Sequence, residues 1–143
     1  MIALLDINVL IARADPAHVF HQRAVSWMAS LRHASIATCP LTENGFLRIY
    51  GNPVYPEGPG SPAAASALLA AIRRLPQHVF LPDDISLSDT ARITTLAGAG
   101  HSQLTDLYLL ALAASHSAVF ATFDRRIDPA MAVGGVAALL VIP

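Results

Sequence analysis

The sequence predicts an α/β fold in which a central parallel sheet of about five strands is flanked by helices on both faces. Short apolar runs without turn residues, such as Ile2–Leu5, are typical of strands that are buried on both faces of a sheet. They alternate with segments that carry apolar residues at helical spacing, such as His18–Leu31. This alternation is typical of parallel strands joined by helical crossovers, and 143 residues suffice for one domain spanning residues 1–143.

The expected strands are short apolar runs, most of which end at a turn or polar residue. In chain order they are Ile2–Leu5, Ser35–Cys39, His78–Leu81, Ala118–Phe123 and Val136–Ile142. Most of the expected helices carry apolar residues three or four positions apart. They cover Asn8–Ala14, His18–Leu31, Leu41–Tyr50, Ala63–Leu75, a segment from Ser86 or Ser88 to Ala97, and Gln103–Ser115. We expect Thr42 to cap the third helix, and the Gly- and Pro-rich segment Gly51–Pro62 to be a loop.

The composition excludes several classes of protein. A net charge of −1 provides no overall field that would attract nucleic acid, so any RNA contact must be local. The single cysteine, Cys39, rules out an internal disulfide. No apolar run reaches the ~18 residues of a membrane span, and the N-terminus lacks a signal peptide, so we expect a cytoplasmic protein. Apolar residues make up 54% and charged residues only 13%, which indicates a large buried sheet or a surface that a partner covers.

Four of the ten acidic residues lie in apolar surroundings at element boundaries. Asp6 and Asp124 each end an apolar strand, whereas Glu43 and Asp106 lie in the first turns of helices. Because ligands of open α/β sheets bind at the carboxyl ends of the strands, these four side chains are expected to converge there. The alternative is that each acid only caps a helix, and for Asp6 the two interpretations stay open on this stretch alone.

Convergence of these acids would be costly without a cation. Two carboxylates ~4 Å apart repel each other by about 4 kcal/mol at an effective dielectric constant of 20. Divalent Mg²⁺ or Mn²⁺ removes that repulsion and prefers oxygen ligands. Such a site, with open water positions, suits hydrolysis of a phosphodiester by one or two metal ions.

Four stretches of the chain resemble the PIN-domain ribonucleases, and within them the VapC-type toxins of bacterial toxin–antitoxin pairs. The stretches are LLDINVL at Leu4–Leu10, LTENGFLRI at Leu41–Ile49, TDLYLLALA at Thr105–Ala113 and ATFDRRI at Ala121–Ile127. The resemblance implies that Asp6, Glu43, Asp106 and Asp124 form the catalytic, metal-binding set. Asn8 and Thr122 match supporting polar positions of the family, whereas Ile7 departs from the small or hydroxyl residue often found there.

The resemblance also implies a function. It is that of an endoribonuclease that depends on Mg²⁺ or Mn²⁺ and cleaves structured RNA, such as tRNA or ribosomal RNA, by attack of water. The protein would be the toxin of a toxin–antitoxin pair and form a homodimer that binds its antitoxin. The alternative is a catalytically silent PIN-like module that binds RNA or protein. A receiver domain and a P-loop both need a lysine, which the chain lacks, and Gly98–Gly100 is too short for a dinucleotide-binding loop.

The basic residues of the chain are all arginines. The candidates for contact with RNA phosphates are Arg125 and Arg126, followed by Arg48 and Arg13, because they lie nearest the acidic residues in the expected fold. The alternative for each is an ordinary solvated arginine.

Overall fold

The computed structural model describes all residues from Met1 to Pro143 and contains five strands and six α-helices. The strands are β1 (Ile2–Leu5), β2 (Ser35–Thr38), β3 (His78–Phe80), β4 (Val119–Thr122) and β5 (Leu139–Val141). The helices are α1 (Ile7–Ala14), α2 (His21–Ser30), α3 (Pro40–Tyr50), α4 (Pro62–Arg73), α5 (Leu104–Ser115) and α6 (Gly135–Ala138). Two 3₁₀ turns, η1 (His101–Gln103) and η2 (Pro129–Met131), complete the chain. None of these helices has both the length and the apolar character to cross a membrane.

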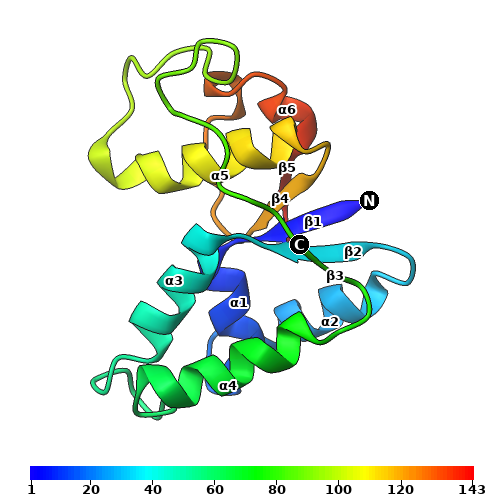
Figure 1. The fold of residues 1–143 in the computed structure, drawn as a ribbon, viewed down its shortest axis with the longest axis vertical. Coiled ribbons are helices and arrows are strands. Elements are labelled where there is room, and N and C mark those ends of the chain that lie inside the picture. The colour runs from blue at the N-terminus through cyan, green and yellow to red at the C-terminus, as the bar shows by residue number, and fades with distance from the viewer.

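All five strands pair in parallel in the order β3-β2-β1-β4-β5, with β1 at the centre (Figure 1). In this register Leu5 of β1 lies beside Ala121 of β4, so the residues that follow β1 emerge next to the end of β4. The predicted α/β class and five-stranded sheet are confirmed.

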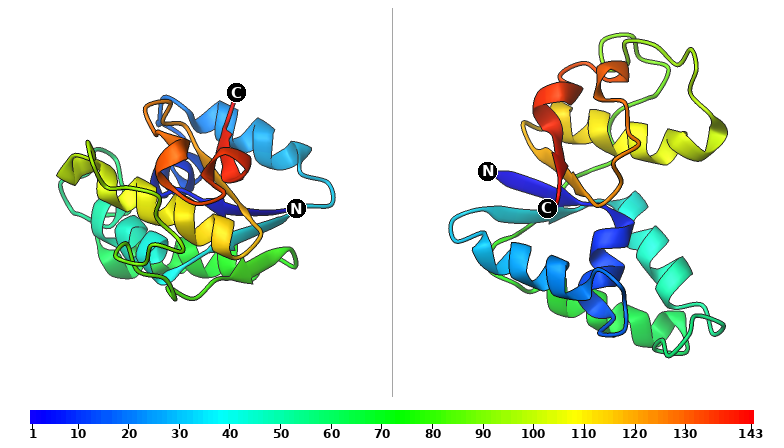
Figure 2. Two further views of the ribbon diagram at one scale, coloured as in Figure 1. Left: turned by 90° about the horizontal axis from the view of Figure 1, so that it is seen from above. Right: turned by 180° about the vertical axis from the view of Figure 1, so that it is seen from behind.

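Helices α1 to α4 lie on one side of the sheet and α5 and α6 on the other (Figures 1 and 2). The alternation of side chains along β1 divides the core accordingly. Ala3 and Leu5 join the apolar cluster that includes Phe46 of α3, whereas Leu4 joins the cluster built on α5. Helix α5 is buried along most of its length, which explains why its sequence is apolar nearly all round.

The helix expected from Ser86 or Ser88 to Ala97 is wrong, because this segment forms successive turns. Side chains there accept hydrogen bonds from backbone amides two residues further along: the hydroxyl of Ser86 accepts from the amide of Ser88, and the carboxylate of Asp89 from the amide of Ala91. Such local hydrogen bonds compete with those of a helix. Ile93 forms an antiparallel bridge with Ala132, which holds the segment against the C-terminal region.

Two other predictions need correction. The strand expected over Val136–Ile142 begins only at Leu139, because Gly134 adopts a left-handed conformation (φ 75°) and leads into helix α6. Thr42 is the third residue of α3 and not its cap, since the helix begins at Pro40, a position where proline loses no hydrogen bond. The Thr42 side chain instead accepts from the amide of the preceding cap, Cys39.

Candidate active site

Asp6 and Thr122 meet where β1 and β4 end. Asp6 occupies the cap position of α1, but its side chain makes no capping hydrogen bond. It is 5% exposed, and its Oδ2 accepts a hydrogen bond of 2.6 Å from the hydroxyl of the fully buried Thr122. The same hydroxyl accepts from the backbone amide of Asp124 at 3.0 Å. Thr122 thus fixes the carboxylate of Asp6 against the segment that carries Asp124.

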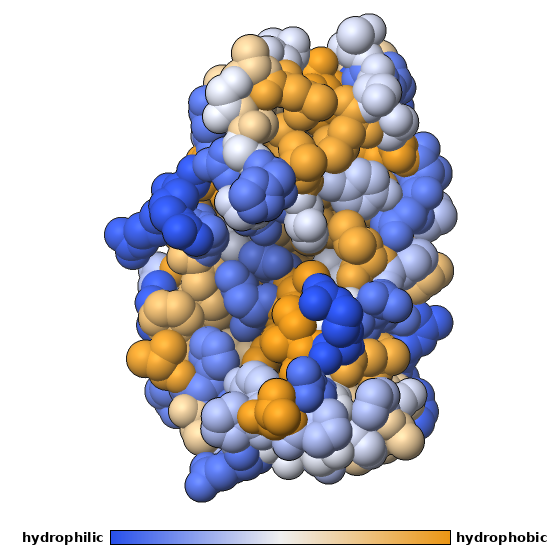
Figure 3. Space-filling model, turned by 90° about the vertical axis from the view of Figure 1, so that its left-hand side faces the viewer, coloured by the Kyte–Doolittle hydropathy of each residue, from blue (hydrophilic) through white to orange (hydrophobic).

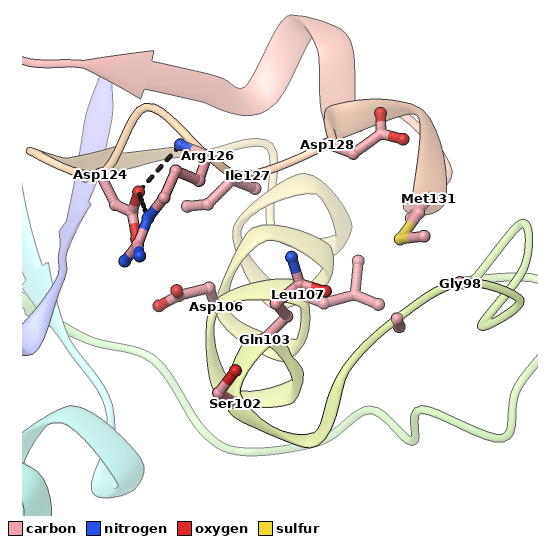
Figure 4. A pocket seen from close by; sticks show the side chains of 11 residues that line it. Gly98, Ser102, Gln103, Asp106, Leu107, Asp124, Arg126, Ile127, Asp128 and Met131 are labelled. Carbon is pink, nitrogen blue, oxygen red and sulfur yellow. Dashed lines mark hydrogen bonds and ion pairs between the residues drawn. The ribbon is translucent and has the colours of Figure 1, made fainter.

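Asp106 and Asp124 line one cavity of about 370 Å³ (Figure 4). Asp106 projects from the first turn of α5, and Asp124 from the loop that follows β4. In Figure 4 these carboxylates lie towards one end of the cavity, and Met131 and Gly98 lie at the other. Two acids that are far apart in the sequence are therefore brought together at the edge of the sheet.

The three aspartates influence one another electrostatically. Burial, opposed by the hydrogen bond from Thr122 and reinforced by the charges of Asp106 and Asp124, raises the pKa of Asp6 to about 6. Burial and the charge of Asp124 also raise the pKa of Asp106. Their negative forms are therefore disfavoured in the metal-free protein, and a nearby cation would stabilise them.

Asp124 is already paired with a cation. Its Oδ1 accepts from Nε of Arg126 at 3.0 Å and its Oδ2 from Nη2 at 2.9 Å, and the backbone amide of Arg126 also donates to Oδ1 at 2.8 Å. These hydrogen bonds lower the pKa of Asp124. Because both carboxylate oxygens are engaged, a metal ion at Asp124 would compete with this guanidinium.

Glu43 faces a different set of partners. Its Oε1 accepts from the hydroxyl of Thr38 at 2.7 Å and pairs with Nη1 of Arg73, the last residue of α4. The guanidinium of Arg73 lies 4.7 Å from the centre of the Phe80 ring. The hydroxyl of Thr38 has a single proton, which it donates to Glu43. Nε2 of His78, 2.8 Å from this hydroxyl, is therefore the donor in their hydrogen bond, and Thr38 accepts. Burial and the charge of Arg73 lower the pKa of His78, which favours this neutral form.

The structure therefore brings Asp6, Asp106 and Asp124 together and turns Glu43 towards Arg73. In these side-chain conformations no three His, Cys, Asp or Glu residues are close enough to surround a metal ion. The donor types nevertheless fit Mg²⁺ or Mn²⁺, because all are oxygens. Oδ1 of Asn8, two residues after Asp6, is buried without a hydrogen-bond partner. Such an orphaned oxygen is costly unless it gains a ligand.

The predicted RNA-contacting arginines lie in different places. Arg126 borders the acidic cavity and Arg125 is exposed beside it in the sequence. Arg48 is exposed on α3. Arg13 instead lines a separate groove with Met28 of α2, on the side of the sheet that α1 to α4 cover. Of the four arginines, only Arg126 lines the cavity.

Sequence reasoning missed the partners of Glu43. A basic residue in the last turn of a helix, such as Arg73, is favourable there by position alone, and this pattern says nothing about tertiary contacts. Thr38 did carry a signal, since it ends β2 as Thr122 ends β4, and each buried hydroxyl donates to an acid. The cavity itself depends on how the loop before α5 packs against the segment after β4, a tertiary contact that the sequence pattern does not report.

The fold and this acidic edge of the sheet define a class of protein. The family model of the PIN domain matches residues 3–130, and the chain belongs to this family.

Relatives from Mycobacterium tuberculosis are similar over most of their length. The chain is 42% identical to Ribonuclease VapC44 over 127 residues, which cover 89% of each chain. It is 39% identical to Ribonuclease VapC39 over 139 residues, covering 97% of this chain and all of the relative. It is 41% identical to Ribonuclease VapC38 over 126 residues, covering 87% of this chain and 86% of the relative.

Proposed function

We propose that the protein is a metal-dependent endoribonuclease that cleaves structured RNA and acts in the cytoplasm as the toxin of a toxin–antitoxin pair. The observation that carries the proposal is the convergence of Asp6, Asp106 and Asp124 at the carboxyl edge of the sheet, beside an open cavity. The names of the relatives, each called a ribonuclease, support the substrate class. Structured RNA such as tRNA or ribosomal RNA is the substrate we infer.

The residues that hold the metal are Asp6, Asp106 and Asp124, with Glu43 as a fourth ligand. Bound Mg²⁺ or Mn²⁺, as one or two ions, supplies a Lewis acid and a water of lowered pKa for phosphodiester hydrolysis. Thr122 orients the carboxylate of Asp6 through its 2.6 Å hydrogen bond, and Asn8, two residues further along, has a buried amide oxygen without a partner.

Electrostatics limit how the chain holds an RNA backbone. Three aspartates repel phosphates, so the bound cation and nearby guanidinium groups must offset that repulsion. Arg126 is the best placed, because its exposed side chain borders the cavity, and its guanidinium, now paired with Asp124, would contact a phosphate oxygen there. Arg125 is a second contact of this kind, and Arg48 a more distant one.

The test is cleavage of an RNA substrate by the purified wild type and by Asp6→Asn, with Mn²⁺ or with excess chelator. We expect cleavage with Mn²⁺ only, leaving 5′-phosphate and 3′-hydroxyl ends, and loss of at least ~100-fold in Asp6→Asn. Asp89→Asn is the matched control, since Asp89 lies in the turn segment and only binds a local amide. Full cleavage in chelator, or full activity of Asp6→Asn, would contradict the mechanism.

The second candidate function is a catalytically silent module that binds RNA or protein. The clustered acids at the carboxyl edge of the sheet argue against it, because a silent fold gains nothing from the repulsion between Asp6, Asp106 and Asp124. Binding of RNA without any cleavage in Mn²⁺ or Mg²⁺, by protein that binds the metal, would favour this candidate.

We also propose a protein partner, the antitoxin, and a homodimer of the chain. Apolar patches lie on both sides of a central hydrophilic band on the face in Figure 3. Large apolar side chains are exposed over the molecule as a whole at Met1, Val19, Ile49, Val54, Leu68, Leu75, Phe80, Leu96, Val133 and Val136. Surfaces of this kind are commonly covered by a partner.

The partner proposal predicts that the chain expressed alone is poorly soluble and that co-expression with a small protein encoded beside it restores solubility. Size-exclusion chromatography with light scattering measures both states. A soluble, monodisperse monomer that gains nothing from co-expression would contradict this proposal and leave the nuclease proposal intact.

A further inference from the structure

The cavity beside Asp106 and Asp124 extends well beyond the two carboxylates. Its lining includes three large apolar side chains: Ile127 beside Arg126, Leu107 of α5 in the middle, and Met131 at the far end, where Asp128 also lies (Figure 4). Its volume of about 370 Å³ lies in the range of small-molecule binding sites. The cavity thus has an end with Asp106 and Asp124, where hydrolysis is proposed, and a further part with apolar surface at Leu107 and Met131 that hydrolysis does not need.

The walls of this cavity are fixed by the backbone. The amide of Thr94 donates to the carbonyl of Met131 at 2.8 Å, and the amide of Val133 to the carbonyl of Arg92 at 2.9 Å. These bonds tie the turn segment before α5 to the segment that carries Met131. Gly98 at the rim has a φ of +83°, a conformation that other residues rarely adopt. The cavity is therefore preformed and needs no large rearrangement to accept a ligand.

Two polar side chains at the cavity have hydrogen-bonding atoms without a partner in the chain. The side-chain oxygen of Gln103 accepts from the amide of Gly100 at 2.9 Å, but the Gln103 amide nitrogen donates to no group of the chain. The hydroxyl of Ser102 likewise has no partner within the chain, and both residues are exposed. The cavity thus offers a donor and a hydroxyl next to an apolar wall.

We propose that this cavity receives one base of the RNA substrate, from a nucleotide adjacent to the phosphodiester that is cut; the inference rests on the proposed nuclease function. A phosphate is a poor occupant of the part near Met131, because Asp128 lies there and Arg126, the arginine that lines the cavity, is paired with Asp124. A base is uncharged, packs its face against apolar side chains and the sulfur of Met131, and presents polar edges to Gln103 and Ser102. With the base held there, the sugar–phosphate backbone extends towards the charged end.

The test measures kcat/KM for RNA oligonucleotides in which a single nucleotide near the cut is made abasic. For the wild type in Mn²⁺ we expect a loss of roughly ten- to hundredfold at one position adjacent to the cut, the size expected for one stacked base. Abasic nucleotides further from the cut should change kcat/KM by less than about twofold.

Two variants connect this effect to the cavity. Ser102→Trp fills the cavity from an exposed position, and Met131→Ala removes its apolar wall. In both we expect intact and abasic RNA to be cleaved at nearly the same rate. Because each comparison is made within one variant, a general loss of folded protein cancels. Ser88→Trp, on the same turn-rich stretch but outside the cavity, is the matched control and should keep the wild-type ratio.

The outcomes separate this inference from the proposed function. If the wild type cleaves RNA but no abasic position near the cut matters, or if both cavity variants keep the wild-type ratio, the cavity does not bind a base. If the variants weaken only the binding of the protein partner, the cavity belongs to that partner and the inference is overturned. If the wild type cleaves no RNA in the presence of metal, the proposed function itself fails, and the inference with it.

Discussion

Replacing Asp6 by asparagine should stabilise the metal-free protein at neutral pH, although it removes a residue of the proposed active site. The pKa of Asp6 is raised from 3.8 to about 6 in the folded protein. Above pH 6 the carboxylate is ionised in both states, and the folded state carries the cost of its burial and of its acidic neighbours. Asparagine is neutral, and its side-chain oxygen can still accept the hydrogen bond from Thr122.

The magnitude follows from the shift. One pKa unit corresponds to 1.36 kcal/mol, so a rise of about two units makes Asp6→Asn more stable by up to about 3 kcal/mol at pH 7.5. For a chain of this length that is a rise of roughly 6–12 °C in melting temperature. The sign reverses the usual behaviour of an acid: wild-type stability falls as the pH rises from about 4 to about 6. At pH 4 the carboxyl is protonated in the folded state and about half ionised in the unfolded state, so most of the variant's advantage should be gone.

Thermal melts at pH 4 and pH 7.5, in chelator, measure this difference for the wild type, Asp6→Asn and the control Asp89→Asn. Taking differences from the wild type removes the titration of all other groups. Saturating Mn²⁺ should stabilise the wild type by ~2.7 kcal/mol at a hundredfold excess over Kd, and Asp6→Asn by much less. A variant that is equally destabilised at both pH values would refute the reasoning, because Asp6 would then be an ordinary structural residue.

Two further predictions concern contacts that the structure revealed. Arg73→Gln should tighten Mn²⁺ binding by roughly fivefold in calorimetry, because the metal no longer competes with Arg73 for Glu43, whereas Arg74→Gln on the same helix end should have no effect. Equal Mn²⁺ affinities in the wild type and both variants would show that Glu43 does not bind the metal. Tyr55→Phe should lower the free energy of unfolding by ~1–3 kcal/mol in urea melts, because it leaves the buried carboxylate of Asp15 without the 2.7 Å hydrogen bond from the phenol; an unchanged stability would show that this loop contact contributes nothing.

Strands and buried helices were the predictable part of the fold. The strand Ile2–Leu5 was predicted with its observed bounds, because a short apolar run that ends at a charged residue fits few structures other than a buried strand. Helix α5 followed from its length and apolar character. The turn segment before it was mistaken for a helix because its pattern was read without the competing hydrogen bonds of Ser86 and Asp89. Apolar periodicity reports burial, and it does not report such local polar competition.

The acidic edge was predictable because the carboxyl ends of parallel strands converge whatever the side chains do. The counter-ions were not, because Arg126 and Arg73 reach their partners through side-chain conformation and, for Arg73, across 30 residues of sequence. The raised pKa of Asp6 was equally hidden, since it depends on burial to 5% exposure. Sequence therefore located the acids, whereas their protonation and pairing required the structure.

The most direct test of the central claim is to sequence the ends of cellular RNAs after the protein is induced without its partner. The account predicts new 5′-phosphate ends at a few defined positions in structured RNA, present with the wild type and absent with Asp6→Asn at equal protein levels. The same new ends in Asp6→Asn, or new ends that carry a 5′-hydroxyl, would contradict metal-dependent hydrolysis at this site.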